Sequence, residues 1–248
     1  LSFSDMAASD VSGQSRGFGR FRGAIKRGLY RALDPLVNLL VHAGVTPNLI
    51  TFVGFAMNIF AAGWFIWSAE TATRMDLGKV GWGGFWILVA GVFDMLDGRV
   101  ARKTRAASRF GALFDSVMDR YSELVMFLGI CYYLVSYHYF LSSLFAFIAL
   151  MGSMMVSYVR ARAEGLGIEC SDGLMQRPER IITIGLSGIL CGVVAEVFGT
   201  FYWKVESLPF HLLENMSLFT LPIALLAVLA NYTAISRLLH CRRQLMEL

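Results

Sequence analysis

Long apolar stretches recur along the chain, and each has about the length of a helix that crosses a membrane. They lie near residues 49–68, 80–98, 111–136, 140–160, 180–199 and 218–237. A helix needs about 20 consecutive apolar residues to span a bilayer, and backbone polar groups in lipid must be satisfied within the segment itself. The pattern therefore predicts an all-α integral membrane protein with six transmembrane helices.

The segment before the first stretch has a different pattern. Between Phe21 and Val45 basic residues alternate with apolar ones at spacings of three and four, which is typical of an amphipathic helix on a membrane surface. Residues 1–19 are rich in Ser, Gly and Asp and have no apolar period, which indicates disorder. We therefore divide the chain into a disordered cytoplasmic tail (1–19), an amphipathic surface helix (20–45), a six-helix domain (46–240) and a cytoplasmic tail (241–248).

The distribution of Lys and Arg residues predicts how the protein is oriented in the membrane. Hydrophobic residues make up 56% of the chain, and the net charge is only +4. Most of the 22 Lys and Arg residues, however, lie in the N-terminal segment, the second and fourth connections and the C-terminal tail. Cytoplasmic loops carry an excess of Lys and Arg, so both termini are predicted to face the cytoplasm. The basic face suits membrane lipids with anionic headgroups or phosphorylated substrates, and we expect no nucleic-acid partner.

Four aspartates interrupt the second and third apolar stretches. Asp94 and Asp97 are three residues apart, and Asp115 and Asp119 are four apart, so each pair projects from one face of its helix. An unpaired carboxylate at membrane depth costs roughly 2.5 to 3.5 kcal/mol. Divalent metal ions are the simplest compensation, because oxygen-rich clusters suit Mg²⁺, Mn²⁺ or Ca²⁺.

Two other interpretations explain the acidic residues without a reaction. The aspartates could form buried ion pairs with Arg99, Arg102 and Arg120, although this leaves the small residues nearby unexplained. They could instead line the pathway of a cation transporter, as intramembrane carboxylates often do. All four, however, lie near one face of the membrane instead of being spread across it. We therefore favour a metal centre.

The acidic segment reads D-x2-D-G-x2-A-R-x8-G-x3-D-x3-D from Asp94 to Asp119. This pattern resembles the signature of the CDP-alcohol phosphotransferase family, membrane enzymes that build phospholipid headgroups. The resemblance implies that Asp94 and Asp115 bridge two Mg²⁺ or Mn²⁺ ions and that Asp97 completes one of the two sites. It further implies that Asp119 completes the other site and acts as the catalytic base, and that the protein is a homodimer.

Small residues beside the aspartates indicate where a nucleotide could approach. Gly98, Ala101 and Gly111 leave backbone exposed near the carboxylates, and Arg102 offers a fork of donors to a phosphate. In the family, the start of the first span and a Ser or Thr before the third also contact the CDP-lipid, although here a helix cap and a polar turn explain them equally well. The predicted CDP-lipid residues are Thr46, Pro47, Asn48, Leu49, Gly98, Ala101, Arg102, Ser108 and Gly111.

The fourth connection narrows the choice of acceptor. The sequences VSYVRARAE (156–164) and QRPER (176–180) resemble the branch that contains bacterial phosphatidylinositol-phosphate synthases. An acceptor with its own phosphate needs cationic side chains near the metals. The predicted acceptor-phosphate residues are Ser157, Arg160, Arg177, Arg180 and Arg237. Alternatively, these arginines only mark the cytoplasmic side.

The resemblance implies a complete reaction. A phosphatidyl group would pass from CDP-diacylglycerol to inositol phosphate with release of CMP, in a multi-pass protein of the cell inner membrane whose active site faces the cytoplasm. Glycerol 3-phosphate is also a phosphorylated polyol. Synthesis of phosphatidylglycerol phosphate from that acceptor therefore stays open as the alternative.

Overall fold

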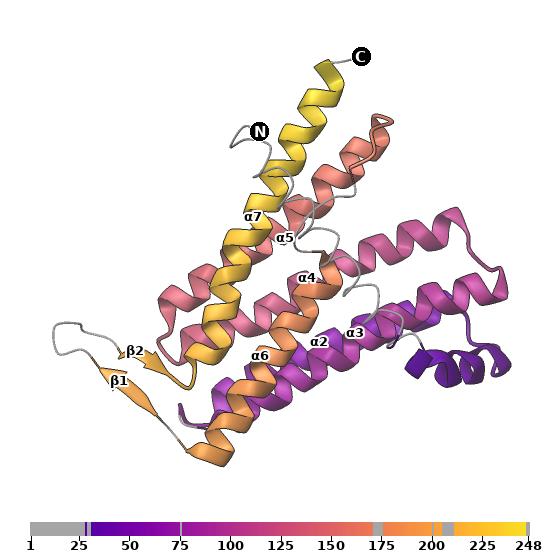
Figure 1. Cartoon of the computed structure of the whole chain (residues 1–248). Coiled ribbons are helices and arrows are strands. Elements are labelled where there is room, and N and C mark those ends of the chain that lie inside the picture. Colours follow the sequence, from indigo (N-terminus) through magenta and orange to yellow (C-terminus); the bar gives the residue numbers. More distant parts are fainter. Residues whose placement is uncertain are drawn as a thin grey trace, which may run out of the picture.

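Six long helices dominate the structure, a computed structural model that describes residues 28, 31–74, 76–170, 176–199, 201–204 and 211–246. The helices are α2 (Pro47–Thr71), α3 (Gly78–Thr104), α4 (Arg109–Ser136), α5 (Phe140–Gly165), α6 (Arg177–Phe198) and α7 (Ser217–Met246) (Figure 1). Five of these described helices, all except α4, are long and apolar enough to cross a membrane. The prediction of an all-α, multi-pass membrane protein is confirmed.

Each predicted span coincides with one of these helices to within a few residues at either end, except where α3 and α7 extend further. Helix α3 continues to Thr104, and α7 continues to Met246, so the segment predicted as a tail from residue 241 begins as helix. Helix α4 has 28 residues but carries several acidic and basic residues in its first half, which lowers its hydropathy. Its crossing of the membrane, and with it the count of six spans, stays a prediction. The predicted tail over residues 1–19 lies outside the described residues.

A small β-hairpin between α6 and α7 departs from the all-helical expectation. Strands β1 (Tyr202–Lys204) and β2 (His211–Glu214) pair antiparallel, with Tyr202 opposite Glu214 and Trp203 opposite Leu213. Figure 1 places this hairpin at the end of the bundle where α6 finishes and α7 begins. Sequence periodicity gave no sign of it, because the two strands have only three and four residues.

The surface helix is present over residues 31–42 and is drawn in indigo beside the end of α3 (Figure 1). Val37 is buried in a cluster with Ile50 of α2 and with Leu96 and Val100 of α3. Ion pairing between Asp34 and Arg99 attaches its polar face to α3. The predicted amphipathic pattern thus packs one face of this helix onto the ends of α2 and α3.

Glycines let α3 and α6 approach each other closely. A Cβ atom at Gly84 would lie 2.4 Å from the carbonyl oxygen of Gly185, and one at Gly192 would lie 2.7 Å from the Cα of Gly81. Such small-residue faces allow helix backbones in membranes to pack by van der Waals contact. The two helices run antiparallel, so their shared face leads from the hairpin end of the bundle to the start of α6, where Arg177 meets Asp94.

The other helices pack in pairs by similar means. Gly129 of α4 lies against the backbone of Ala62 in α2, and Gly152 of α5 lies against Asn231 of α7. The main core contains Phe65, whose ring stacks on Phe219 at 6.0 Å between centroids. Many large apolar side chains remain exposed on the outside of the bundle, as expected of a protein surrounded by lipid.

Candidate active site

A tight turn brings the two acidic segments together. Helix α3 ends at Thr104, and the next residue, Arg105, adopts a left-handed conformation with φ of 53°. Helix α4 begins after Ser108, whose hydroxyl accepts a hydrogen bond from the Gly111 amide at 2.9 Å. Counted from Arg105 and Ser108, Asp94 and Asp119 are each 11 residues away along their helices. At about 1.5 Å of rise per residue they lie at about the same depth.

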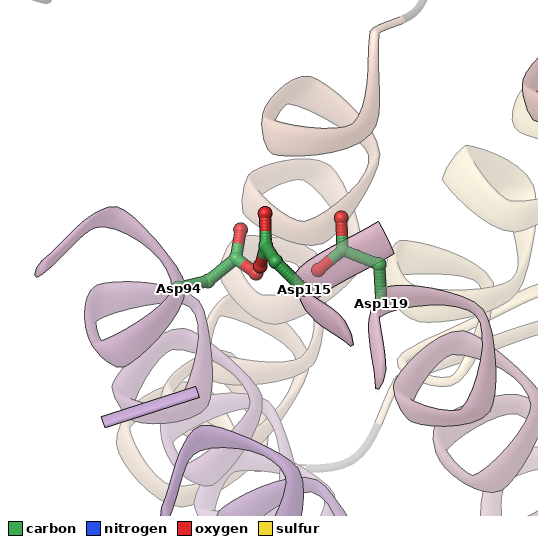
Figure 2. A group of neighbouring side chains, drawn as sticks. All are labelled: Asp94, Asp115 and Asp119. Atoms are coloured by element: carbon green, nitrogen blue, oxygen red, sulfur yellow. The ribbon is translucent and has the colours of Figure 1, made fainter. Parts of the chain in front are cut away.

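Three of the four aspartates form a compact cluster. Asp94, Asp115 and Asp119 each offer a carboxylate oxygen, and these oxygens all lie within 4.8 Å of one another. Figure 2 shows Asp94 from α3 and Asp115 and Asp119 from α4 pointing toward a common space. Carboxylate oxygens at this spacing can share a hard divalent cation. The three side chains are partly exposed, so an ion and a substrate phosphate can reach them.

Asp97 lies beside this cluster but is oriented differently. Its Oδ2 accepts a hydrogen bond from Thr51 Oγ1 of α2 at 2.8 Å, and its side chain is buried. Asp97 nevertheless lines the same pocket as Asp94 and Asp119, together with small or polar residues of α2 such as Gly54 and Asn58. Thr51 thus engages one oxygen of this carboxylate, and the role of Asp97 as a metal ligand stays a prediction.

A basic residue from α6 enters the cluster. The Nη1 atom of Arg177 pairs with Asp94 and lies 2.6 Å from Oδ1 of Asp119. Arg177 lies at the first position of α6, directly after Gln176, whose side chain forms a capping box with Glu179. The cap and the close α3–α6 packing together set the place of this guanidinium group.

A second, fully buried ion pair supports Arg177. Glu123 is one helical turn beyond Asp119 on α4 and is only 3% exposed, and Arg180 is 2% exposed. Arg180 Nη2 lies 2.6 Å from Glu123 Oε1, while Arg177 Nε lies 3.8 Å from the same oxygen. Three acidic residues thus surround Arg177, and Arg180 balances the charge of the most buried one.

Glu123 was missing from the sequence-based prediction. The spacing of Asp115 and Asp119 continues by four residues to Glu123, so the acidic face of α4 runs one turn deeper than the signature. That periodicity could have identified Glu123, although only the fold shows that it meets α6.

The contacts of Arg99 and Arg120 give little support to the alternative of simple ion pairs between the aspartates and neighbouring arginines. Arg99 pairs with Asp34 of the surface helix, and Arg120 donates to the Ser116 hydroxyl at 2.5 Å. The cation that pairs with Asp94 and Asp119 comes from α6, which no local spacing could indicate.

Several of the predicted CDP-lipid residues gather at the α3–α4 turn. A Cβ atom at Gly111 would lie 3.0 Å from Ser108 Oγ and 3.4 Å from Asn48 Oδ1, so the starts of α2 and α4 meet there. One at Gly98 would lie 3.5 Å from the Arg102 guanidinium. Thr46 is the residue before α2, Pro47 begins that helix and Leu49 is exposed. The roles of these residues, and that of Ala101, stay predictions.

The predicted acceptor residues fall into two groups. Arg177 and Arg180 surround Glu123 at the start of α6. Ser157, Arg160 and Arg237 lie on α5 and α7, where Arg237 is buried and donates from Nη1 to the Val156 carbonyl oxygen at 2.9 Å. Arg160 is exposed and pairs with Glu164 one turn along α5 at 2.8 Å. Their contacts with an acceptor stay predictions.

Comparisons with known proteins agree with this site. A family model described as CDP-alcohol phosphatidyltransferase matches residues 44–213. A phosphatidylinositol phosphate synthase of Mycobacteroides abscessus is 34% identical over 161 residues, which cover 64% of this chain and 69% of the relative. An archaetidylinositol phosphate synthase of Methanothermobacter thermautotrophicus is 32% identical over 226 residues, or 91% of this chain and 94% of the relative.

Solved structures resemble the fold as well. A Mycobacterium tuberculosis phosphatidylinositol phosphate synthase with bound CDP-DAG is similar with a TM-score of 0.63 and 27% identity, over 85% of this chain and 94% of that one. A second structure of that protein, in complex with manganese and citrate, has a TM-score of 0.63, 27% identity and coverage of 84% and 87%. The resemblance extends over nearly the whole bundle.

Proposed function

The chain belongs to the CDP-alcohol phosphatidyltransferase family, and we propose that it transfers a phosphatidyl group from CDP-diacylglycerol to inositol phosphate with release of CMP. The observation that carries this proposal is the convergence of Asp94, Asp115 and Asp119 on one point beside Arg177. The cluster combines ligands for a divalent cation with a group that can bind a phosphate.

The names of the relatives support inositol phosphate as the acceptor more strongly than they support a particular lipid donor. The bacterial and the archaeal relatives carry different lipid parts in their names, phosphatidyl and archaetidyl, yet both names contain inositol phosphate. The CDP-DAG bound to the Mycobacterium tuberculosis protein supports a diacylglycerol donor for this chain too. Inositol phosphate and CDP-diacylglycerol are therefore the substrates that we assign.

The residues present fit a divalent metal. Asp94, Asp115 and Asp119 would hold it, with Asp97 as a further ligand, and the use of two Mg²⁺ or Mn²⁺ ions is our assignment. Such ions, when bound, neutralise charge on the diphosphate and on the leaving CMP. The manganese in the Mycobacterium tuberculosis structure supports this choice.

Asp119 is the residue that we assign as the base. In the reaction, the acceptor hydroxyl oxygen forms a bond to the lipid-side phosphorus, the bond from that phosphorus to the bridging oxygen breaks, and CMP departs with that oxygen. The hydroxyl proton passes to a carboxylate oxygen of Asp119, which must come within hydrogen-bond distance. Asp119 is partly exposed in the cluster, so an acceptor can approach it.

Arginines of α5, α6 and α7 would bind the phosphate of the acceptor. Arg160 is exposed, and its partner Glu164 lies in the same helix; an exposed ion pair of this kind is worth little, so Arg160 can exchange it for a phosphate. Arg237 is already held in place by the Val156 carbonyl. We assign Ser157, Arg177 and Arg180 to the same acceptor site.

The orientation follows from the distribution of charge. We place the cluster at the cytoplasmic side of the inner membrane, because the basic connections lie at that end of the bundle. We also propose a homodimer in the membrane, since many large apolar side chains of the bundle are exposed.

The reaction can be tested with purified protein in detergent, CDP-diacylglycerol and Mn²⁺. CMP release should require inositol phosphate. When labelled inositol phosphate is supplied, the lipid product should carry the label. Turnover with glycerol 3-phosphate and none with inositol phosphate would overturn the assignment of inositol phosphate as the acceptor. Absence of CMP release with either acceptor would overturn the reaction itself.

A further inference from the structure

Arg177 and a divalent metal would bind two of the same carboxylates. Its guanidinium group meets Oδ1 of Asp94 and Oδ1 of Asp119, and these two carboxylates belong to the cluster that can hold a metal ion. A guanidinium group and a divalent cation held at such close range repel each other, because both are positively charged. Metal binding by Asp94 and Asp119 therefore competes with their pairing to Arg177.

A second place for Arg177 lies directly behind the cluster. Glu123 Oε1 is 3.8 Å from Arg177 Nε, which is slightly too far for a hydrogen bond. Among the described residues, this buried Nε atom has no hydrogen-bond partner. A shift of about 1 Å toward Glu123 would supply one at ordinary hydrogen-bond distance. Arg177 is thus poised between two sets of carboxylates.

Arg180 keeps the second place available. Its Nη2 lies 2.6 Å from Glu123 Oε1, and both side chains are almost completely buried. The pair with Arg180 holds the Glu123 carboxylate in position. Glu123 can therefore accept a second guanidinium without reorganisation of the helices.

We propose that Arg177 is a built-in counter-ion of the metal centre, which divalent metal displaces from Asp94 and Asp119, and that Glu123 is the positioning residue that receives it. This inference rests on the proposed function, because it takes the cluster to be the metal site. Arg177 then stays beside the metal, held by Glu123, where it can meet the phosphate of the acceptor. Metal binding and the readiness of the acceptor site are thereby coupled.

Competition predicts that loss of Arg177 strengthens metal binding. Purified protein in detergent, stripped of metal with a chelator, would be titrated with Mn²⁺, and free Mn²⁺ would be measured by electron paramagnetic resonance. Arg177→Gln should bind Mn²⁺ roughly tenfold more tightly than the wild type, because no positive group competes for the oxygens. Arg177→Lys keeps the charge and should stay near the wild-type affinity. Arg162→Gln, at an exposed position of α5, is the matched control and should change nothing.

The role of Glu123 needs a double-mutant cycle. Glu123→Gln should weaken Mn²⁺ binding several-fold, because Arg177 then stays on the aspartates. In the Arg177→Gln background, the same change should have little effect, since the arginine through which it acts is absent. If Glu123 acted only through its charge on the metal, Glu123→Gln would weaken Mn²⁺ binding equally in both backgrounds. That result would overturn the assignment of Glu123 as the residue that receives Arg177.

Thermal unfolding gives a readout that needs no activity. Metal-stripped Arg177→Gln should unfold at a lower temperature than the stripped wild type, because Asp94 and Asp119 lose their counter-ion. Added Mn²⁺ should raise the unfolding temperature of this variant by more than that of the wild type. If Arg177→Gln bound Mn²⁺ as tightly as the wild type or less tightly, competition between Arg177 and the metal would be overturned. A wild-type protein that binds no Mn²⁺ and releases no CMP would instead overturn the proposed function.

Discussion

Thr51 on α2 donates a hydrogen bond of 2.8 Å to Asp97 on α3, and both side chains are buried. The bond joins two helices and sets the direction of the one aspartate of the signature that stands outside the compact cluster. Partners of this kind orient metal ligands from behind, and their loss typically costs 10- to 100-fold in metal affinity.

Thr51→Val should therefore weaken metal binding, because valine keeps the shape of threonine but cannot orient Asp97. We expect the Mn²⁺ concentration for half-maximal CMP release to rise about tenfold. Thr71→Val is the control, since the Thr71 hydroxyl donates to the Trp67 carbonyl one turn earlier in α2. A similar response of the two variants would show that Thr51 does not position Asp97.

Asp119→Asn should nearly abolish transfer, because the amide cannot take the proton of the acceptor. General base catalysis contributes about 10²- to 10⁴-fold, and we expect CMP release at saturating Mn²⁺ to fall by at least that factor. Asp76→Asn, in the turn before α3 where Asp76 pairs with Lys79, should keep full activity. A purified, folded Asp119→Asn variant that still turns over would remove Asp119 from the role of base.

Gly84→Ala should destabilise the bundle, because the added Cβ would lie 2.4 Å from the Gly185 carbonyl oxygen of α6. Forcing extra atoms into a close contact costs typically about 1 to 3 kcal/mol. We expect a lower unfolding temperature in detergent together with lower activity, because the same helix pair aligns Arg177 with Asp94. Gly63→Ala has no atom within 4 Å of its new Cβ and should be neutral or slightly stabilising. Equal stability of the two variants would contradict the close α3–α6 contact.

Arg160→Gln should raise the KM for inositol phosphate and leave the KM for CDP-diacylglycerol unchanged. Loss of one charged hydrogen bond to a phosphate corresponds to about 1.5 to 3 kcal/mol, or roughly 10- to 150-fold in KM. Because Arg160 is exposed, the unfolding temperature should hardly change. Arg162→Gln, two residues further along α5, should affect neither KM. An unchanged KM in Arg160→Gln would remove Arg160 from the acceptor site.

Much of the local structure was predictable from periodicity alone. All six apolar stretches became helices, because backbone in lipid has no other way to satisfy its hydrogen bonds within one segment. The spacing of Asp115 and Asp119 likewise placed both on one face of α4. The β-hairpin was not predictable, since strands of three and four residues leave too short a pattern.

The sequence by itself determined that this is a multi-pass membrane protein and that Asp94, Asp115 and Asp119 belong to one acidic site, because helical periods and a short turn are local properties. The tertiary structure decided what surrounds that site. Arg177 reaches the carboxylates from α6 because glycine faces let α3 and α6 pack closely, and Glu123 matters because Arg180 lies opposite it. Such contacts between residues more than fifty positions apart depend on helix packing, which no local pattern in the chain encodes.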